Sequence, residues 1–178
     1  MMKVAIGGSF SIYNKMIKLA NELKAMGIEV TLPKHFQGLT DPSKIEKLKK
    51  DVKSGKQKLS PQDYIKIGKV ETWFLQQIEN ADYLIILTEA IKEGKQIKGY
   101  IGINTAIDIA YALAKRKEVI LTHQPKDSGI QGLYHYISKH KPKNLGKIKI
   151  MNTPTIKTYL KKQLQSKQTA SKIHNDIN

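Results

Sequence analysis

Short continuous runs of apolar residues alternate along the chain with longer stretches in which apolar residues recur every three or four positions. Such runs lie at Met2–Ile6, Ile28–Leu32, Asp82–Thr88 and Glu118–Thr122, and at Lys147–Met151 lysine and apolar residues alternate, as suits an edge strand. Runs of this kind are typical of strands in a parallel sheet, whereas the longer spacing is typical of helices. The pattern therefore predicts an α/β fold, a doubly wound parallel sheet of five strands with helices on both faces.

Helical spacing covers 12–26, a stretch that starts at 61, then 103–115, 131–138 and a stretch that starts at 154. Ser11 and Ser60 are the expected N-caps of the first two helices. Gly27 is placed to end the first helix. The inner face of the second helix is expected to carry four apolar residues, Ile65, Val70, Phe74 and Ile78. The segment from Glu89 to Gly99 is expected to be a polar loop.

The length of 178 residues suits one domain with a single core. We expect a nucleotide-binding type of α/β domain over residues 1–165, with a lysine-rich, exposed and partly mobile insertion at 35–59 that contains a short helix at 43–52. Residues 166–178 are polar and are expected to form a disordered tail.

Composition excludes several classes of site. The chain has no cysteine, which excludes disulfides and thiolate metal sites. Its five histidines are scattered without metal-ligand spacing, so we expect no metal and no cofactor. Neither a signal peptide nor an apolar run of membrane-spanning length is found, and we therefore expect a cytoplasmic protein without a membrane partner. We also expect a homo-oligomer.

The formal net charge of +16 comes almost entirely from lysine, and Arg116 is the only arginine. Two interpretations remain open. The lysines form a solvated surface, or they bind nucleic acid weakly and without sequence preference, since lysine attracts phosphates but recognition of base edges usually relies on arginine.

Residues 99–112, with the sequence GYIGINTAIDIAYA, carry most of the information on chemistry. A glycine-containing turn opens an apolar helix that holds one carboxylate, Asp108, and a buried unpaired carboxylate is costly unless it is hydrogen-bonded or chemically employed. Helical spacing predicts one apolar stripe that packs on the sheet, formed by Ile103, Ala106, Ile107, Ala110 and Leu113. It predicts a polar strip beside it, formed by Asn104, Thr105, Asp108 and Tyr111. The polar strip would form a wall of a small-molecule pocket.

Three segments that follow strand ends are expected to converge at the carboxyl edge of the sheet, where doubly wound folds bind ligands. They are the turn Gly7-Gly8-Ser9-Phe10, the pair Thr88-Glu89, and residues 99–108. Candidate substrate-binding residues are Gly7, Gly8, Ser9, Phe10, Tyr13, Gly102, Asn104 and Thr105. The alternatives are a plain tight turn at the glycines and, for Asp108, a helix-start carboxylate that accepts backbone N–H groups.

Three features together resemble the nucleoside 2-deoxyribosyltransferase-like family, which includes nucleoside-phosphate N-glycosidases. They are the glycine-rich first turn, the Glu79-Asn80-Ala81-Asp82 entry to a hydrophobic strand, and the glycine turn before an acidic helix, and the resemblance covers roughly residues 2 to 125. It implies a flavodoxin-like sheet. It also implies cleavage or transfer at the N-glycosidic bond of a nucleoside or a nucleoside 5′-monophosphate, with an acid of the helix attacking the anomeric carbon.

The resemblance places Asp108 at the nucleophile position, where the family usually has glutamate, as nucleophile or as stabiliser of an oxocarbenium ion. Glu71 or Glu89 would donate a proton to the leaving base, and Gly8 and Ser9 would hold the 5′ group. Phe74 stands where the family tends to have an aspartate. Two alternatives remain: a non-catalytic nucleotide-binding module, and a phosphoribohydrolase of the lysine-decarboxylase-like family, whose Pro-Gly-Gly and acidic pair this chain lacks.

Overall fold

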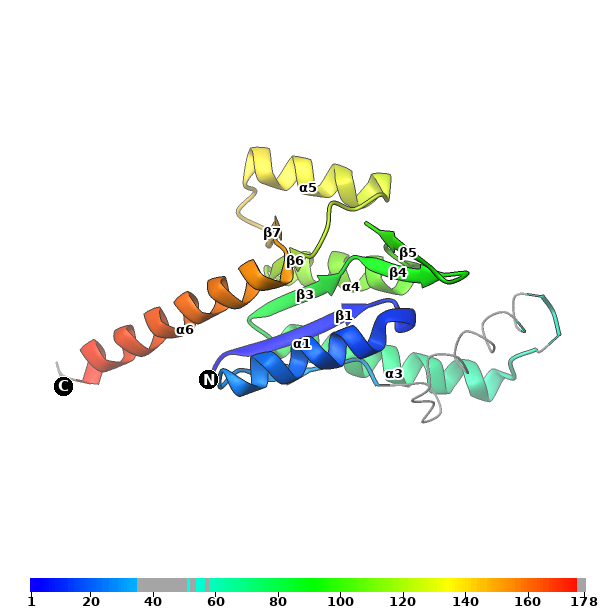
Figure 1. Ribbon diagram of the computed structural model, residues 1–178, viewed down its shortest axis with the longest axis horizontal. Coiled ribbons are helices and arrows are strands. Elements are labelled where there is room, and N and C mark those ends of the chain that lie inside the picture. Colours follow the sequence, from blue (N-terminus) through cyan, green and yellow to red (C-terminus); the bar gives the residue numbers. More distant parts are fainter. Residues whose placement is uncertain (35–50, 52–53, 57, 176–178) are drawn as a thin grey trace.

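The fold is a single parallel sheet covered by helices on both faces, in a computed structural model that describes residues 1–34, 51, 54–56 and 58–175 (Figure 1). The strands are β1 (Lys3–Gly8), β2 (Glu29–Thr31), β3 (Tyr83–Leu87), β6 (Glu118–Leu121) and β7 (Lys147–Ile150). They form a five-stranded sheet in the order β2-β1-β3-β6-β7, and every neighbouring pair is parallel. The predicted fold class is confirmed, and the architecture is flavodoxin-like.

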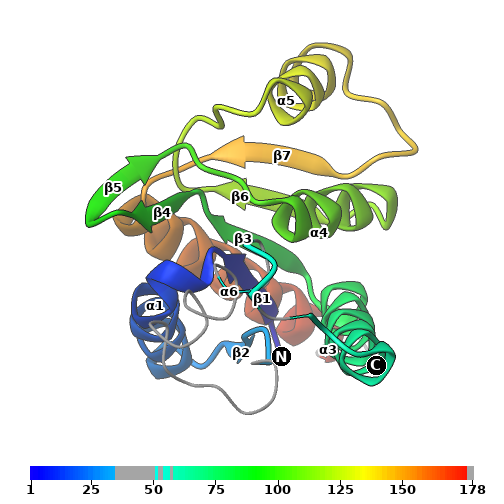
Figure 2. The same cartoon turned by 90° about the vertical axis from the view of Figure 1, so that its right-hand side faces the viewer.

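Each face of the sheet is covered by its own set of helices (Figure 2). Helices α1 (Tyr13–Ala25) and α6 (Thr153–Asn175) pack on one face, around a core that includes Ile6, Ile85 and Ile156. Helices α3 (Pro61–Asn80), α4 (Ile103–Ala114) and α5 (Ser128–His140) pack on the other face, around a core that includes Phe74, Ile86 and Ile109. The crossover helix α1 thus lies on one face and the crossover helices α3, α4 and α5 on the other, so the central strands are buried on both sides.

The start of α3 is as predicted, whereas the start of α1 is not. Ser60 and Asp63 form a capping box, with the Asp63 N–H donating to Ser60 Oγ at 3.2 Å and the Ser60 N–H donating to Asp63 Oδ2 at 3.0 Å. A short 3₁₀ helix, η1 (Phe10–Ile12), precedes α1, and no side chain caps α1 itself. Ser11 Oγ instead accepts the Ile91 N–H at 2.9 Å, so its predicted role as an N-cap is wrong.

The expected polar loop between Glu89 and Gly99 is a β-hairpin. Strands β4 (Glu89–Lys92) and β5 (Lys95–Lys98) pair antiparallel. The two residues between them, Glu93 and Gly94, have φ values of 51° and 74°, as a two-residue hairpin turn with a right-handed twist requires. The sequence prediction was wrong because lysines surround the few apolar residues of these strands and hide the alternation.

Helix α4 ends at Ala114, one residue before the predicted end, and it is rotated relative to the prediction: Leu113 alone of the expected apolar stripe is buried, together with Thr105 and Asp108 of the expected polar strip. Its buried residues are Thr105, Asp108, Ile109, Ala112 and Leu113. Ile103 and Ile107, which were expected to pack on the sheet, are 80% and 53% exposed. The helix is apolar nearly all round, so its periodicity could not decide which side faces the core. Ile65 of α3 is likewise 51% exposed, although it was expected on the inner face.

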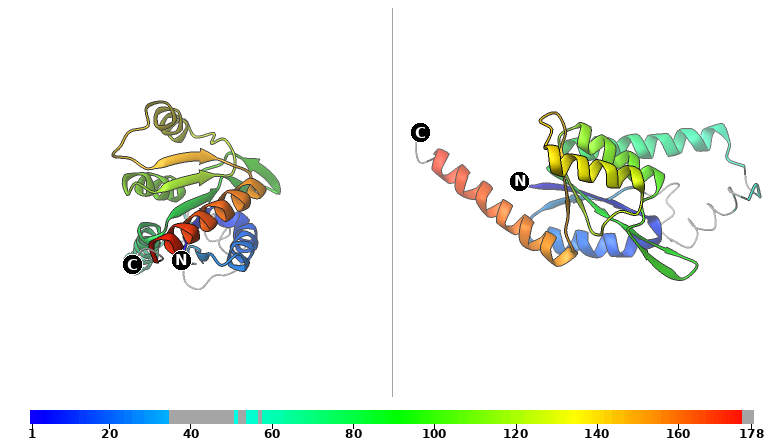
Figure 3. Two further views of the ribbon diagram at one scale, coloured as in Figure 1. Left: turned by 90° about the vertical axis from the view of Figure 1, so that its left-hand side faces the viewer. Right: turned by 90° about the horizontal axis from the view of Figure 1, so that it is seen from above.

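Two further predictions concern the ends and the insertion. Helix α6 continues past Ser166 to Asn175, where a polar tail was expected, and it projects beyond the sheet (Figure 3). The insertion at 35–59 and its short helix at 43–52 lie largely outside the described residues. Within the part of the chain that the structure describes, no helix combines the length and the apolarity needed to cross a membrane.

Candidate active site at the carboxyl edge of the sheet

The candidate site lies where β1, β3 and β6 end. The turn after β1 leads into η1, the chain after β3 enters the hairpin, and α4 begins at its N-cap Gly102. Gly99 joins the chain after β3 to the chain after β6, because its N–H donates to Thr88 O at 2.7 Å and its carbonyl accepts the Lys126 N–H at 2.8 Å. Its φ of 78° suits glycine, and a Cβ there would lie 2.5 Å from the Gln124 carbonyl oxygen. The segments predicted to converge do so.

Asp108 lies against the end of β1. A Cβ built on Gly7 would lie 3.8 Å from Asp108 Oδ2, 3.7 Å from the Phe74 ring and 2.9 Å from Ile86 Cδ1. The approach of Ile86 leaves no room for a Cβ, so this position favours glycine, and the Asp108 carboxylate lies within van der Waals reach of the same spot. Asp108 is only 6% exposed, so it belongs to the buried side of α4.

The carboxyl of Asp108 is held in an environment that favours its neutral form. Among the described residues, none donates a hydrogen bond to it or pairs with it as a cation. Burial, with the negative charge of Glu71 as a second cause, raises the pKa of Asp108 to about 7. A half-ionised carboxyl near neutral pH can act as a nucleophile, a base or an acid, and such a shift is typical of functional sites.

Glu71 reaches the site from α3. Its Oε1 accepts a hydrogen bond from Asn104 Nδ2 at 2.8 Å. Two turns further along the same pair of helices, Glu79 accepts hydrogen bonds from Tyr111 and Lys115, each at 2.7 Å. These contacts fix α3 beside α4. The first of them places Asn104 and Glu71 together at the start of α4.

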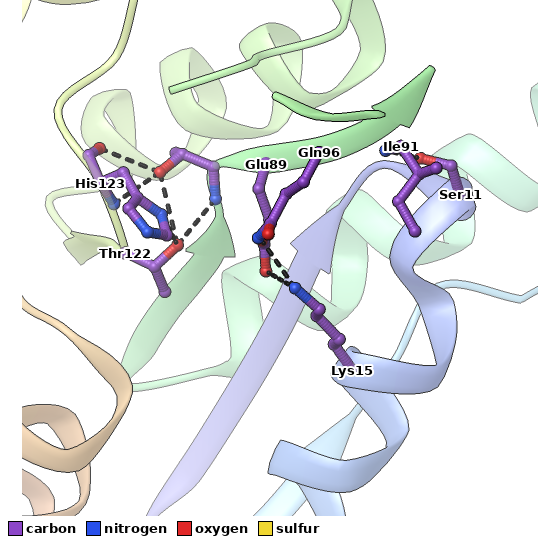
Figure 4. Close-up of polar contacts among 8 residues, drawn as sticks. Ser11, Lys15, Glu89, Ile91, Gln96, Thr122 and His123 are labelled. Carbon is purple, nitrogen blue, oxygen red and sulfur yellow. Dashed lines mark hydrogen bonds and ion pairs between the residues drawn. The ribbon is translucent and has the colours of Figure 1, made fainter. Parts of the chain in front are cut away.

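Glu89 lies in a second group of polar side chains, between α1 and the hairpin (Figure 4). Lys15 Nζ donates to both of its carboxylate oxygens, at 3.0 and 2.9 Å, and Gln96 Nε2 also donates to it. Burial by itself would raise the pKa of Glu89, but the hydrogen bonds from Lys15 and Gln96 and the charges of Lys15 and His123 outweigh burial and lower it. Glu89 is therefore ionised at neutral pH and fastens the hairpin to α1.

Thr88, Thr122 and His123 form a third group, of which only Thr88 was expected at this edge from the sequence. Thr122 Oγ1 accepts the Thr88 N–H at 2.9 Å, and Thr88 Oγ1 accepts the His123 N–H at 2.7 Å and donates to the His123 carbonyl at 2.9 Å. His123 Nδ1 lies 3.2 Å from Thr122 Oγ1. Each threonine directly follows a buried strand, and that position was the available signal. The group ties the ends of β3 and β6 together and directs His123 toward the edge.

The remaining predicted binding residues surround the first turn and the start of α4. Ser9 Oγ accepts the Ser11 N–H at 3.4 Å, and the rings of Phe10 and Tyr13 lie 6.2 Å apart. Thr105 is 7% exposed, on the same buried side of α4 as Asp108. Burial raises the pKa of Tyr13. Gly8 follows Gly7 at the end of β1.

Three hollows on the described surface lie away from Asp108. One of about 480 Å³ lies between α5 and β7, one of about 520 Å³ between Met26 and α6, and one of about 330 Å³ beside Asp82 and Arg116. Among the described residues, no group of three or more histidines, aspartates or glutamates could hold a metal ion.

Comparisons with protein-family models, with curated proteins and with solved structures found no match to this chain. The resemblance to the nucleoside 2-deoxyribosyltransferase-like family thus rests on the residues quoted for it.

Proposed function

We propose that the protein cleaves or transfers at the N-glycosidic bond of a nucleoside or a nucleoside 5′-monophosphate. The observation that carries this proposal is Asp108. Its carboxyl is buried beside Gly7, it has no hydrogen-bond donor among the described residues, and its pKa is about 7. A carboxylate beside the sugar is the group that glycosidic bond cleavage needs.

In the proposed reaction, Asp108 in its ionised form forms a bond to the anomeric carbon while the bond from that carbon to the base nitrogen breaks. The bonding electron pair leaves with the base, which takes a proton from an acid of the site. Water then hydrolyses the glycosyl ester, or a second base captures the sugar. If Asp108 forms no covalent bond to the anomeric carbon, its negative charge would instead stabilise an oxocarbenium ion. Because Asp108 is 6% exposed, the covering side chains have to move before a sugar reaches it.

Glu71 suits the role of proton donor better than Glu89. Glu89 is paired with Lys15 at 2.9 Å and its pKa is lowered, so it holds a proton poorly at neutral pH. Glu71 lies within electrostatic reach of Asp108. We therefore propose Asp108 and Glu71 as the reacting pair and Glu89 as a positioning residue.

The test incubates the protein with a panel of nucleosides and 5′-monophosphates and measures free base by chromatography. We expect release by the natural chain, loss of release in Asp108→Asn, and a strong decrease in Glu71→Gln. Glu79→Gln is the matched control, because Glu79 lies on the same helix and also binds α4. Absence of release from every compound by the folded protein would overturn the proposal.

A non-catalytic nucleotide-binding module is the second candidate. The observation that favours it is Phe74, which is 2% exposed and packs beside Gly7 where the resemblance implies an acid. Thermal-shift measurements separate the two candidates. A ligand at 100 times its dissociation constant stabilises a protein by roughly 2.7 kcal/mol, so nucleotide-dependent shifts without base release would favour the module.

A further inference from the structure

The outward side of α4 is an apolar stripe that no described element covers. Ile103, Ile107, Ala110 and Ala114 are all exposed and follow one another at intervals of four, three and four residues. Such spacing places them in one line along the helix. We call these four residues the α4 stripe. Two of them, Ile103 and Ile107, are 80% and 53% exposed, unusual for isoleucine in a helix at the centre of a layer.

The α4 stripe is complementary to a second copy of itself. It has two large residues in its first half and two small residues in its second half. When two such helices pack antiparallel about a two-fold axis between positions 108 and 109, Ile103 of each copy faces Ala114 of the other. Ile107 likewise faces Ala110. A large side chain then meets a small one along the whole stripe, which is the self-complementarity that a two-fold interface requires.

The charge distribution also favours a second copy at this face. The chain carries 31 basic residues, yet none falls within residues 70–80 of α3 or residues 103–114 of α4. The acids Glu71 and Glu79 flank the stripe there, and Lys115, Arg116 and Lys117 follow its end. An antiparallel pair brings Glu71, beside the start of one α4, near Arg116 and Lys117 after the end of the other. Glu79, in contrast, is already paired with Lys115 of its own copy. Two copies therefore meet where a chain of net charge +16 repels itself least.

We propose that the protein forms a two-fold homodimer through the α4 stripe. The arrangement places the last turn of α4 of the second copy beside Gly102 and Asn104, so the second copy forms one side of the opening of the candidate site. The inference does not depend on the proposed reaction, because it rests on the exposure, spacing and charge of α3 and α4.

The first experiment measures mass in solution by sedimentation equilibrium over a dilution series. We expect the natural chain to reach twice its 20.1 kDa mass. Ile107→Lys should weaken association by at least about tenfold, because it places two charges at the centre of the interface. Tyr136→Lys is the matched control, since Tyr136 is 54% exposed on α5 and lies outside the stripe. A natural chain that stays monomeric throughout, or a dimer unchanged by Ile107→Lys, would overturn the proposal.

The second experiment tests the antiparallel register and uses the absence of cysteine from the chain. Ile107→Cys and Ala110→Cys are purified separately and then mixed under mild oxidation. We expect rapid disulfide formation in the mixture and slow formation in either variant alone, because only the mixed pair brings the two thiols within bonding distance. Equally rapid self-linking of Ile107→Cys would overturn the antiparallel arrangement. Circular dichroism confirms that each variant is folded.

Discussion

Asp108 and Gly7, 101 residues apart in the chain, lie side by side: a Cβ added to Gly7 would be 3.8 Å from Asp108 Oδ2. The end of β1 thus presents bare backbone to the only buried carboxyl of α4. Because no described residue donates a hydrogen bond to this carboxyl, its burial destabilises the fold whenever it is ionised. A cost of this kind is expected at a site kept for function rather than for stability.

The cost should be measurable as a dependence of stability on pH. The pKa of Asp108 is about 7 in the folded chain against a reference of 3.8, so between these values the folded state binds more protons than the unfolded state. The free energy of unfolding contributed by Asp108 is therefore retained below about pH 4 and lost as pH rises through 7. At ~1.4 kcal/mol per unit, the loss has an upper limit of roughly 4 kcal/mol.

Asp108→Asn removes this titration and keeps the shape of the side chain. We expect the variant to gain stability over the natural chain progressively from acidic to mildly alkaline pH, as measured by urea unfolding at several pH values. Other groups titrate equally in both proteins and cancel in the difference. A difference between the two proteins that stays constant with pH would contradict the assigned pKa.

Gly7→Ala should lower the stability of the fold. The new Cβ would lie 2.9 Å from Ile86 Cδ1, so the core has to shift, at a cost of about 1–3 kcal/mol. Gly68→Ala on α3 is the control, because a Cβ there meets nothing within 4 Å, and it should stabilise by about 0.5–1 kcal/mol. Thermal unfolding of both variants checks the expectation, and equal effects at the two positions would show that the approach at Gly7 has no consequence.

Sequence patterns predicted the sheet well because each strand carries its own information. A continuous apolar run such as Tyr83–Leu87 buries all of its side chains only as a central strand that is covered on both faces. This inference needs no knowledge of the rest of the fold. The entry to α3 was predictable for the same reason, since Ser60 and Asp63 interact within one turn. Local chemistry of this kind can be interpreted from a few neighbouring residues.

The sequence predictions were wrong where contacts with residues far away in the chain determine the local structure. Ser11 was expected to cap α1, but its hydroxyl accepts the backbone N–H of Ile91, 80 residues away. Helix α4 offers apolar residues on nearly every side, so its orientation is set by packing against β1 and α3 rather than by its own pattern. The same error concealed the α4 stripe, because Ile103 and Ile107 were assigned to the core. Glu89 was a candidate proton donor, and its bond to Lys15, 74 residues away in the chain, could not be foreseen from the sequence.

The pair of Lys15 and Glu89 should hold the hairpin in place. Glu89 is 6% exposed and its pKa is lowered, so its ionised form stabilises the fold at neutral pH, and that contribution is lost as pH falls through its pKa. A double-mutant cycle with Lys15→Ala and Glu89→Gln should give a coupling energy of about 0.5–3 kcal/mol. The more exposed pair of Glu22 and Lys157, also at 2.9 Å, should give less than about 1 kcal/mol.

Hydrogen exchange offers a second measurement on the same pair. The Ile91 N–H is bonded to Ser11 Oγ across the contact of the hairpin with η1, and its protection reports whether the hairpin stays attached. We expect Glu89→Gln to speed exchange at Ile91 and to leave the sheet interior at Ile85 protected. Unchanged exchange at Ile91 together with a small coupling energy would mean that other contacts hold the hairpin.

The pH dependence of base release distinguishes the roles that Asp108 can play. A nucleophile must be ionised, so the rising limb of the pH–rate profile should have its midpoint near pH 7. Glu71→Gln removes the negative charge that, after burial, raises the pKa of Asp108, so the midpoint of the residual activity should move to lower pH.

If Glu71 also donates the proton, an aryl riboside with a leaving group that needs no proton should be cleaved by Glu71→Gln at nearly the natural rate. Glu79→Gln should leave both the midpoint and the rate unchanged, and a rate that falls as pH rises through 7 would make Asp108 the acid of the reaction instead.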